Sequence, residues 1–314
     1  MMTSDGNITS ERPEFFHVCI VNNEEFYLVI AFPSEAYFIN YVTICVVNIL
    51  QEVSTIFLNA LTVLAYWRSS QLQNKTSYFL VMLLSLNDLA VGIISNTTFC
   101  IILVRSALGL HSRVCVLVSL FVASSLCLVS MSFGTLFLLN TERYLSIIHP
   151  IFHRNKATKR RLFKVTVVVW LSLTMQYCIY IFDAPLGRII TSCTICTCLA
   201  IMTFMYAKIF FRSRGTAVSP GCAASKDKSR REFLLKFKEA KSCLIVISCT
   251  FVCFFPMGVV GFLEKTTFVK MVLWYWSPTL LLTGSTINSV IFFWRNPVLR
   301  NEANKIVRQT FSRP

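Results

Sequence analysis

The residues with the clearest potential for chemistry are Glu142, Arg143 and Tyr144, which end a long apolar run in the segment LLNTERYLSIIHP. A carboxylate and a guanidinium at the edge of a nonpolar medium lose part of their water, so separating them requires a conformational change that offsets the loss. The triplet is therefore a candidate for a charge switch. The alternative interpretation is a pair of charged side chains that only anchors a helix end at a membrane surface.

Glu52 and Asp88 are further ionisable residues that lie inside apolar runs. Charged groups are costly in a nonpolar medium, and those that occur there often have a function. The four histidines lie outside these runs, and no nucleophile and base are arranged for catalysis. The cysteines at 193, 196 and 198 have no histidine or carboxylate nearby in sequence to complete a metal site. We therefore predict that the protein is not an enzyme.

The elements that position these residues are predicted to be membrane helices. Hydrophobic residues make up 55% of the 314 residues and charged residues only 14%, with a mean hydropathy of +0.62. A soluble domain of this size needs more charge to cover its surface. Apolar runs of at least about 18 residues are typical of membrane spans. We predict seven spans, at 38–66, 77–103, 114–140, 165–182, 189–211, 242–263 and 268–294.

The fourth and fifth spans are separated only by the segment DAPLGR. Fused, they would form a helix far longer than a bilayer requires, and Pro185 and Gly187 indicate a turn. Pro256 and Pro278 are expected to kink spans six and seven, because proline removes a backbone hydrogen bond within a helix.

The distribution of basic residues predicts the orientation. Most of the 30 Lys and Arg residues follow spans one, three, five and seven, which places the N-terminus outside and the C-terminus in the cytoplasm. The net charge of +15 is thus a topology signal, and no nucleic-acid binding is predicted. Asn7 lies in the sequon NIT on the outer side and is predicted to be glycosylated.

The two ends of the chain are predicted to differ. Segment 1–37 is acidic and is expected to be extracellular, with about its first 35 residues loose, as suits a polar segment of this kind. Segment 295–314 carries Val298, Leu299, Ile306 and Val307 between basic residues. That pattern predicts a short helix on the inner membrane surface, followed by a cytoplasmic tail, with a preference for anionic lipid.

Landmarks in nearly every span resemble those of the rhodopsin-like G-protein-coupled receptors. They occur in the order and spacing of that family and comprise Asn59 in LNALTV, Asp88 in LNDLAVG, the segment TERY, Trp170, Tyr206 in FMYAKIF, CFFP and INSVIFFWR. The resemblance implies an all-α, seven-transmembrane helix bundle, with 38–294 as the receptor domain, at the plasma membrane as a multi-pass protein. It also implies an extracellular ligand, a heterotrimeric G protein and arrestin as partners.

The resemblance assigns switch roles to several residues. Glu142 would hold Arg143 in the resting receptor, and Arg143 would meet the G protein once span six swings outward. The other switch positions are Tyr144, Tyr206, Lys236, Phe254, Pro256, Asn288 and Phe292.

This sequence departs from the family at some of these positions. Lys236 stands where many members have a second acid for Arg143, and Phe254 replaces a tryptophan. The motif in span seven, residues 288–292, lacks its proline and tyrosine. Without a hydroxyl at Phe292, the usual link to Tyr206 cannot form.

The ligand pocket implied by register with the family's motifs is apolar with one hydroxyl. Its residues are Phe121, Ser125, Val129, Phe254 and Met257, which suit an apolar or lipid-like ligand, or a peptide. Amine receptors carry an aspartate at the position of Ser125, so a monoamine gripped there is excluded. Retinal is excluded too, because Lys270 lies at the outer edge of span seven. Glu52 either contacts the ligand or pairs with a neighbouring polar group.

Asp88, Ser132, Ser285 and Asn288 resemble the family's sodium pocket, an oxygen cage suited to a hard cation. Gly284 removes one familiar ligand, and a plain hydrogen-bonded aspartate is the alternative. No other cofactor is predicted.

The usual disulfide at the top of span three is expected to be missing. Cys115 lies about one turn before the family's position, and the loop after span four has no cysteine. We expect Cys115 to stay unbonded, with Cys19 and Cys193 as its remaining candidate partners. The very short outer loop and the absence of a proline in span five loosely resemble the melanocortin and lipid-receptor branch.

Two other functions stay open. A secondary transporter or channel would also have many spans and buried carboxylates, although the chain shows no inverted repeat and no matched pair of glycine-broken spans. A degenerate receptor that no longer couples would explain the altered motif in span seven.

Overall fold

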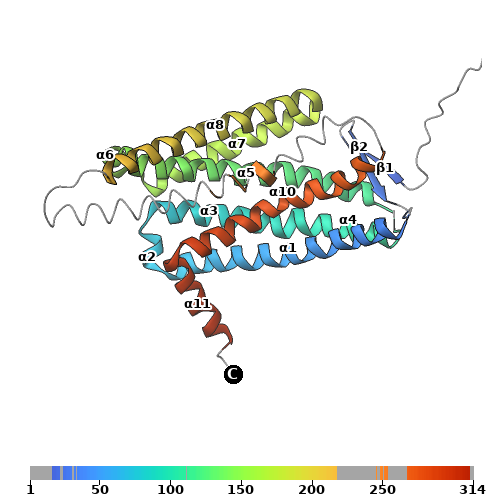
Figure 1. The fold of residues 1–314 in the computed structure, drawn as a ribbon, viewed down its shortest axis with the longest axis horizontal. Helices are drawn as coiled ribbons and strands as arrows, with labels where there is room; N and C mark the ends of the chain where they lie inside the picture. Colours follow the sequence, from blue (N-terminus) through green and yellow to red (C-terminus); the bar gives the residue numbers. More distant parts are fainter. Residues whose placement is uncertain are drawn as a thin grey trace, which may run out of the picture.

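The structure is a computed structural model that describes residues 16–21, 24–29, 32, 34–110, 112–217, 245, 248–249, 251–253 and 267–311. In this part of the chain, long helices run side by side, and a small hairpin lies at one end of them (Figure 1). The elements are β1 (Phe16–Val21), β2 (Glu24–Val29), α1 (Glu35–Arg68), α2 (Ser70–Gln73), α3 (Thr76–Ala90), η1 (Val91–Asn96), α4 (Thr97–Ala107), α5 (Val114–Ile148), α6 (Pro150–Lys156), α7 (Lys159–Phe182), α8 (Ala184–Ala217), α10 (Thr267–Arg295) and α11 (Pro297–Phe311).

Five helical stretches among the described residues are long and apolar enough to cross a membrane, and they coincide with predicted spans one to five. They are Glu35–Arg68, Thr76–Ala107, Val114–Ile148, Lys159–Phe182 and Pro185–Arg212. Helix α10 covers the seventh predicted span. The predicted span at 242–263 lies mostly outside the described residues, as do Asn7, Lys236, Phe254, Pro256 and Met257. Seven spans and the orientation of the chain therefore stay predictions.

Helix α5 is the centre of the bundle. It contacts α3, η1 and α4 on one side and α7 and α8 on the other, while α1 packs against α3 and α10. Gly134 of α5 permits close contact with α7, because an added Cβ would lie 2.7 Å from a methyl carbon of Leu173. Trp170 of α7 donates a hydrogen bond of 3.0 Å to Thr135 Oγ1. The landmark tryptophan thus fastens α7 to the central helix.

The connection between α7 and α8 is shorter than predicted. Only Asp183 separates the two helices, so most of the segment DAPLGR belongs to α8. Asp183 Oδ1 accepts a hydrogen bond of 3.0 Å from the backbone N–H of Leu186, as a residue before a helix often does. Pro185 lies in the first turn of α8. A backbone N–H there has no acceptor within the helix, so the N–H that proline lacks costs no hydrogen bond. The predicted turn is present, but it leaves no outer loop.

The expectation of a loose N-terminal segment is wrong for residues 16–21 and 24–29. Strands β1 and β2 pair antiparallel from Phe16↔Val29 to Val21↔Glu24. Cys19 and Val21 are buried, while Ile20 between them is 71% exposed, which is the alternation of a strand with one covered face. In the sequence, this alternation of buried and exposed residues is obscured by the acidic residues nearby.

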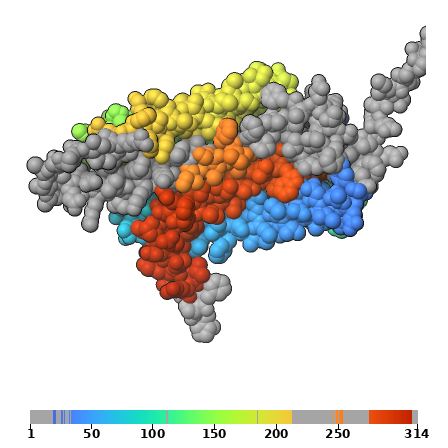
Figure 2. All heavy atoms as spheres, in the orientation of Figure 1, coloured from blue at the N-terminus to red at the C-terminus, as the bar shows by residue number. Residues whose placement is uncertain are grey.

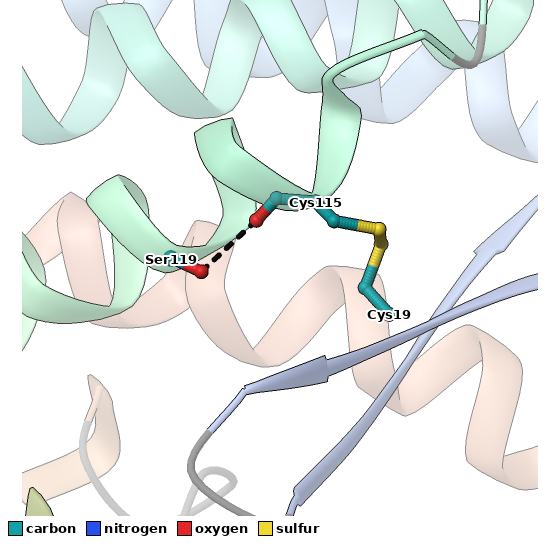
Figure 3. Close-up of a disulfide and its surroundings, with 3 residues drawn as sticks. All are labelled: Cys19, Cys115 and Ser119. Atoms are coloured by element: carbon teal, nitrogen blue, oxygen red, sulfur yellow. Dashed lines mark hydrogen bonds between the residues drawn. A yellow bond between two sulfur atoms is a disulfide. The ribbon is translucent and has the colours of Figure 1, made fainter.

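The expectation that Cys115 stays unbonded is also wrong. Cys19 of β1 forms a disulfide with Cys115 at the start of α5, with 5.3 Å between the Cα atoms (Figure 3). The packing of the hairpin on α5 brings together two cysteines that are 96 residues apart in sequence. The loop after span four takes no part in this bond.

A helix, α11, follows span seven as predicted, and its place on the inner membrane surface stays a prediction. Proline at its first position starts a new helix, and α11 leaves the bundle at an angle to α10 (Figure 1). Leu299 and Ala303 are buried against the bundle. We call the end with the hairpin the outer end and the end with α6 and α11 the inner end, following the predicted topology.

Candidate functional site

The charged pair that ends the third span is buried at the inner end of α5. Glu142 is 4% exposed and Arg143 8%. Glu142 Oε2 lies 3.8 Å from Arg143 Nε, which is longer than a charge-assisted hydrogen bond. The two side chains predicted to form the resting contact are thus adjacent but not tightly joined.

Glu142 is held more closely by two residues to which the sequence analysis gave no role. Thr76 Oγ1, in the first turn of α3, donates a hydrogen bond of 2.8 Å to Glu142 Oε1. His153 Nε2, on α6, lies 2.9 Å from the same oxygen. An ionised carboxylate only accepts hydrogen bonds, so Nε2 carries a proton in this arrangement. Glu142 therefore joins α3, α5 and α6.

Three further switch residues, Tyr144, Tyr206 and Phe292, lie near this end of the bundle. Tyr144 contacts the ring of His149 and packs with Ile147 and Ile209. Tyr206 of α8 stacks on Phe210 with 6.5 Å between ring centroids. Phe292 of α10 is 5% exposed and lies in the apolar cluster at the inner end.

Asp88 and its three predicted partners converge in the middle of the bundle. The carboxyl group of Asp88 is fully buried. Its Oδ1 accepts hydrogen bonds from Ser132 Oγ at 2.5 Å and Ser285 Oγ at 2.8 Å, and its Oδ2 accepts one from Asn288 Nδ2 at 3.1 Å. Helices α3, α5 and α10 meet at this single carboxylate.

The oxygen atoms around Asp88 fit a hard cation. Two carboxylate oxygens and two hydroxyls are the ligand types that such ions prefer, and Asn288 Oδ1 is buried with no hydrogen-bond partner among the described residues. Both hydroxyls now donate to Asp88, and each keeps lone pairs that a cation could use.

A row of hydrogen bonds between α1 and α10 runs along the bundle. In the space-filling view, these two helices lie side by side along one face (Figure 2). Of the residues of α1 in this row, only Asn59 was expected from the sequence to be a landmark. The five bonds are Asn40–Trp276 at 3.1 Å, Asn48–Thr279 at 2.8 Å, Gln51–Thr283 at 3.0 Å, Thr55–Thr286 at 2.5 Å and Asn59–Ser289 at 2.5 Å. The spacing of polar residues on α1, three or four apart from 48 to 59, was the signal that could have found it.

The described part of the predicted ligand pocket lies on one face of α5. Phe121, Ser125 and Val129 are spaced one helical turn apart, and Phe121 stacks on Phe99 of α4 at 4.8 Å. Val129 packs in an apolar cluster with Phe99. Ser125 is 6% exposed, and its hydroxyl has no hydrogen-bond partner among the described residues. A buried hydroxyl in apolar surroundings is a point at which a ligand's polar group could bind.

Glu52 lies against α4. Thr97 Oγ1 donates a hydrogen bond of 2.6 Å to Glu52 Oε1, which is the arrangement expected if Glu52 pairs with a neighbouring polar group. It does not belong to the row that joins α1 to α10.

Comparison with known proteins finds a family model and several distant relatives. The sequence model described as "7 transmembrane receptor (rhodopsin family)" matches residues 58–185, a region that includes Asp88, Glu142 and Arg143. The adenosine receptor A2a of Homo sapiens is 23% identical over 288 residues, covering 80% of this chain and 68% of the relative. That of Canis lupus familiaris is 23% identical over 287 residues, with the same coverage. A dopamine D2-like receptor of Drosophila melanogaster is 29% identical over 122 residues, covering 39% of this chain and 13% of the relative. The landmark residues gather in the helical bundle, and these matches support a distant relationship of the chain to the rhodopsin family of seven-transmembrane receptors.

Proposed function

We propose that this protein is a plasma-membrane receptor that converts the binding of an extracellular, largely apolar ligand into activation of a heterotrimeric G protein. The observation that carries the proposal is the buried Glu142–Arg143 pair at the inner end of α5. It lies on the same helix as the pocket residues Phe121, Ser125 and Val129. A ligand that shifts this helix or its neighbours can therefore act on both ends of the molecule.

Arg143 is the residue that we infer meets the G protein. Its neighbour Glu142 is fixed to α3 and α6 through Thr76 and His153, so the carboxylate stays in place when Arg143 leaves it. Coupling free energies between two sites are commonly about 1–3 kcal/mol, or 5- to 150-fold in a two-state population. Breaking one ion pair such as Glu142–Arg143 at a partly desolvated site changes the free energy by an amount of this order. Arrestin would compete for the same inner surface.

The chemistry of the pocket supports a ligand with a large apolar part and one hydrogen-bonding group. Ser125 supplies the hydroxyl, and the rings of Phe121 and Phe99 supply an apolar wall. The Drosophila relative is named for dopamine, which carries an ammonium group. Ser125 offers no carboxylate to bind such a group, so a monoamine does not suit this pocket.

The test is G-protein activation measured for each G-protein class in cells that express the receptor, with and without a library of lipids and peptides. The matched pair of variants is Arg143→Ala and Arg154→Ala, since Arg154 is an exposed basic residue on α6. We expect Arg143→Ala to lose activation while it reaches the surface, and Arg154→Ala to keep it. The proposal fails if Arg143→Ala signals as the wild type does, or if the wild type activates no class under any condition.

A further inference from the structure

The outer end of the bundle is covered by the N-terminal hairpin rather than by a loop between α7 and α8. That connection consists of Asp183 alone. Strands β1 and β2 lie across the outer end of the helices (Figure 1), and the hairpin is fastened to α5 by the disulfide Cys19–Cys115 (Figure 3).

The inner face of the hairpin is packed against α4 and α5. Val21 is 9% exposed and Leu28 is 4% exposed, whereas Ile20 on the opposite face is 71% exposed. The buried side chains of the hairpin form one apolar cluster with residues of the outer ends of α4 and α5, namely Ile102, Val114, Val118 and Val122. Packing and a covalent bond thus hold the same two strands against the same helices.

This cluster is continuous with the residues that are predicted to line the ligand pocket. Phe121, the outermost described pocket residue, packs against the hairpin cluster and also against the cluster that contains Val129. Phe26 of β2 packs against the hairpin cluster as well. Ser125 lies seven residues after Val118 on α5, which is roughly 10 Å deeper at the rise of an α-helix. The hairpin is therefore on the outer side of the unpartnered hydroxyl.

We propose that the hairpin β1–β2, fastened by Cys19–Cys115, is the lid of the pocket around Ser125. It sets how fast a water-soluble molecule reaches that residue from outside. That this pocket binds a ligand rests on the proposed function, whereas the role of the hairpin as a lid over Ser125 does not. A lid of this kind would slow both the entry and the release of any ligand that arrives from water.

The lid can be tested by the reactivity of a cysteine placed beneath it. Ser125→Cys is introduced, and a positively charged, membrane-impermeant methanethiosulfonate reagent is added to intact cells. The rate of modification is compared with and without the double change Cys19→Ser/Cys115→Ser, which removes the disulfide without leaving a thiol at either of its two positions. The chain without Ser125→Cys gives the background from the other cysteines. Neither ligand nor G protein is needed, so failure of the proposed function leaves this result unaffected.

We expect modification of Ser125→Cys to be at least about tenfold faster once the disulfide is removed, because lid opening limits the reaction. Cys193→Ser is the matched control, since Cys193 is an exposed free cysteine, and it should leave the rate unchanged. Leu28→Ala retains the disulfide but loosens the packing, and it should raise the rate by a smaller factor. If the double cysteine variant fails to reach the surface, the modification rate in Leu28→Ala tests the lid instead. Rates within twofold of each other in surface-expressed variants would overturn the proposal.

Discussion

At the scale of single residues, the switch is shared among more partners than a simple ion pair. Glu142 has contacts of 2.8 Å with Thr76 and 2.9 Å with His153 but only 3.8 Å with Arg143. Thr76 and His153 both contact Oε1, whereas Arg143 lies nearest to Oε2, so the two donors fix the orientation of the carboxylate that Arg143 faces. Thr76 and His153 therefore position the residue that we propose restrains Arg143.

The position of His153 leads to a first prediction. His153→Gln shortens the side chain and weakens its contact with Glu142, so the carboxylate turns toward Arg143 and the resting pair tightens. Losing a hydrogen bond to a charged group changes the balance by about 1.5 kcal/mol, or roughly tenfold. Ligand-free G-protein activation per surface receptor should fall by up to that factor. Arg154→Gln on the exposed side of α6 is the control and should have no effect; a rise in activation in His153→Gln would contradict this explanation.

A second prediction concerns the acid that is missing from span six. Many family members have an acid at the position of Lys236 that attracts the arginine, whereas Lys236 would repel Arg143. Because the resting state then lacks one restraint, we expect measurable signalling without ligand. Lys236→Glu should lower this basal activity and Glu142→Gln should raise it, each by about 5- to 150-fold as the range for such couplings suggests. If Lys236→Glu leaves the basal activity unchanged in a receptor that otherwise signals, the second acid has no role here.

The sequence was sufficient to single out Asp88 and Glu142 because a carboxylate in an apolar run stands out by its energetic cost. It was not sufficient for Thr76 and His153. Both contact Glu142 only because the chain turns at Pro150 and because α3 begins where it does. Those paths depend on how the connections between helices fold, which hydropathy does not report.

At the scale of elements, a row of five hydrogen bonds joins α1 to α10. Lipid is as apolar as leucine, so helices in a membrane are held together by close packing and by polar contacts instead. Gly92 of η1 permits close packing against α1, because an added Cβ would lie 3.0 Å from the side chain of Ile56. Helix α10 is thus tied to α1 along its length and to α3 through Asp88.

The third prediction is that this row stabilises the bundle. Thr55→Val and Thr286→Val each remove one hydroxyl of the pair Thr55–Thr286 without changing the volume of the side chain. In a double-mutant cycle, we expect a coupling energy of about 0.6–1.7 kcal/mol, the range found between membrane helices. Thermal unfolding in detergent is the measurement. Thr43→Val is the control, because Thr43 bonds only to the backbone of its own helix; a coupling energy of zero would show that the row is incidental.

Helical spans were predictable from the sequence and the hairpin was not. Spans one to five matched because a bilayer forces backbone hydrogen bonds into long apolar helices. The hairpin has only six residues in each strand, and its buried side chains Cys19, Val21 and Leu28 need α4 and α5 for their burial. Alternation over so short a stretch is easily hidden by neighbouring acids.

At the scale of the whole molecule, Asp88 is the point at which the three helices of the receptor core are joined. The pocket residue Val129 lies one turn before Ser132 on α5, and Ser132 donates to Asp88. Asn288, which follows the row on α10, donates to the same carboxylate. Any change of state that moves α5 against α10 must rearrange these bonds, so an ion bound there would favour one arrangement over the other.

The last prediction is that sodium binds at Asp88 and favours the resting arrangement. A ligand present at ten times its dissociation constant stabilises the state that it binds by about 1.4 kcal/mol. For a membrane domain of this size, that corresponds to an increase of about 3–6 °C in Tm. We expect this increase when choline chloride is replaced by sodium chloride at equal ionic strength, together with lower basal signalling. Asp88→Asn should abolish both effects.

The control for this experiment is Asp183→Asn, which neutralises an exposed carboxylate between α7 and α8 and should leave the response to sodium intact. Potassium chloride at the same concentration separates selective binding from screening, because screening does not distinguish the two ions. An equal response to sodium in Asp88→Asn would place the ion elsewhere. If the wild type does not respond at all, Asp88 is a hydrogen-bonded aspartate whose partners Ser132, Ser285 and Asn288 satisfy it, and its role is to join the three helices without an ion.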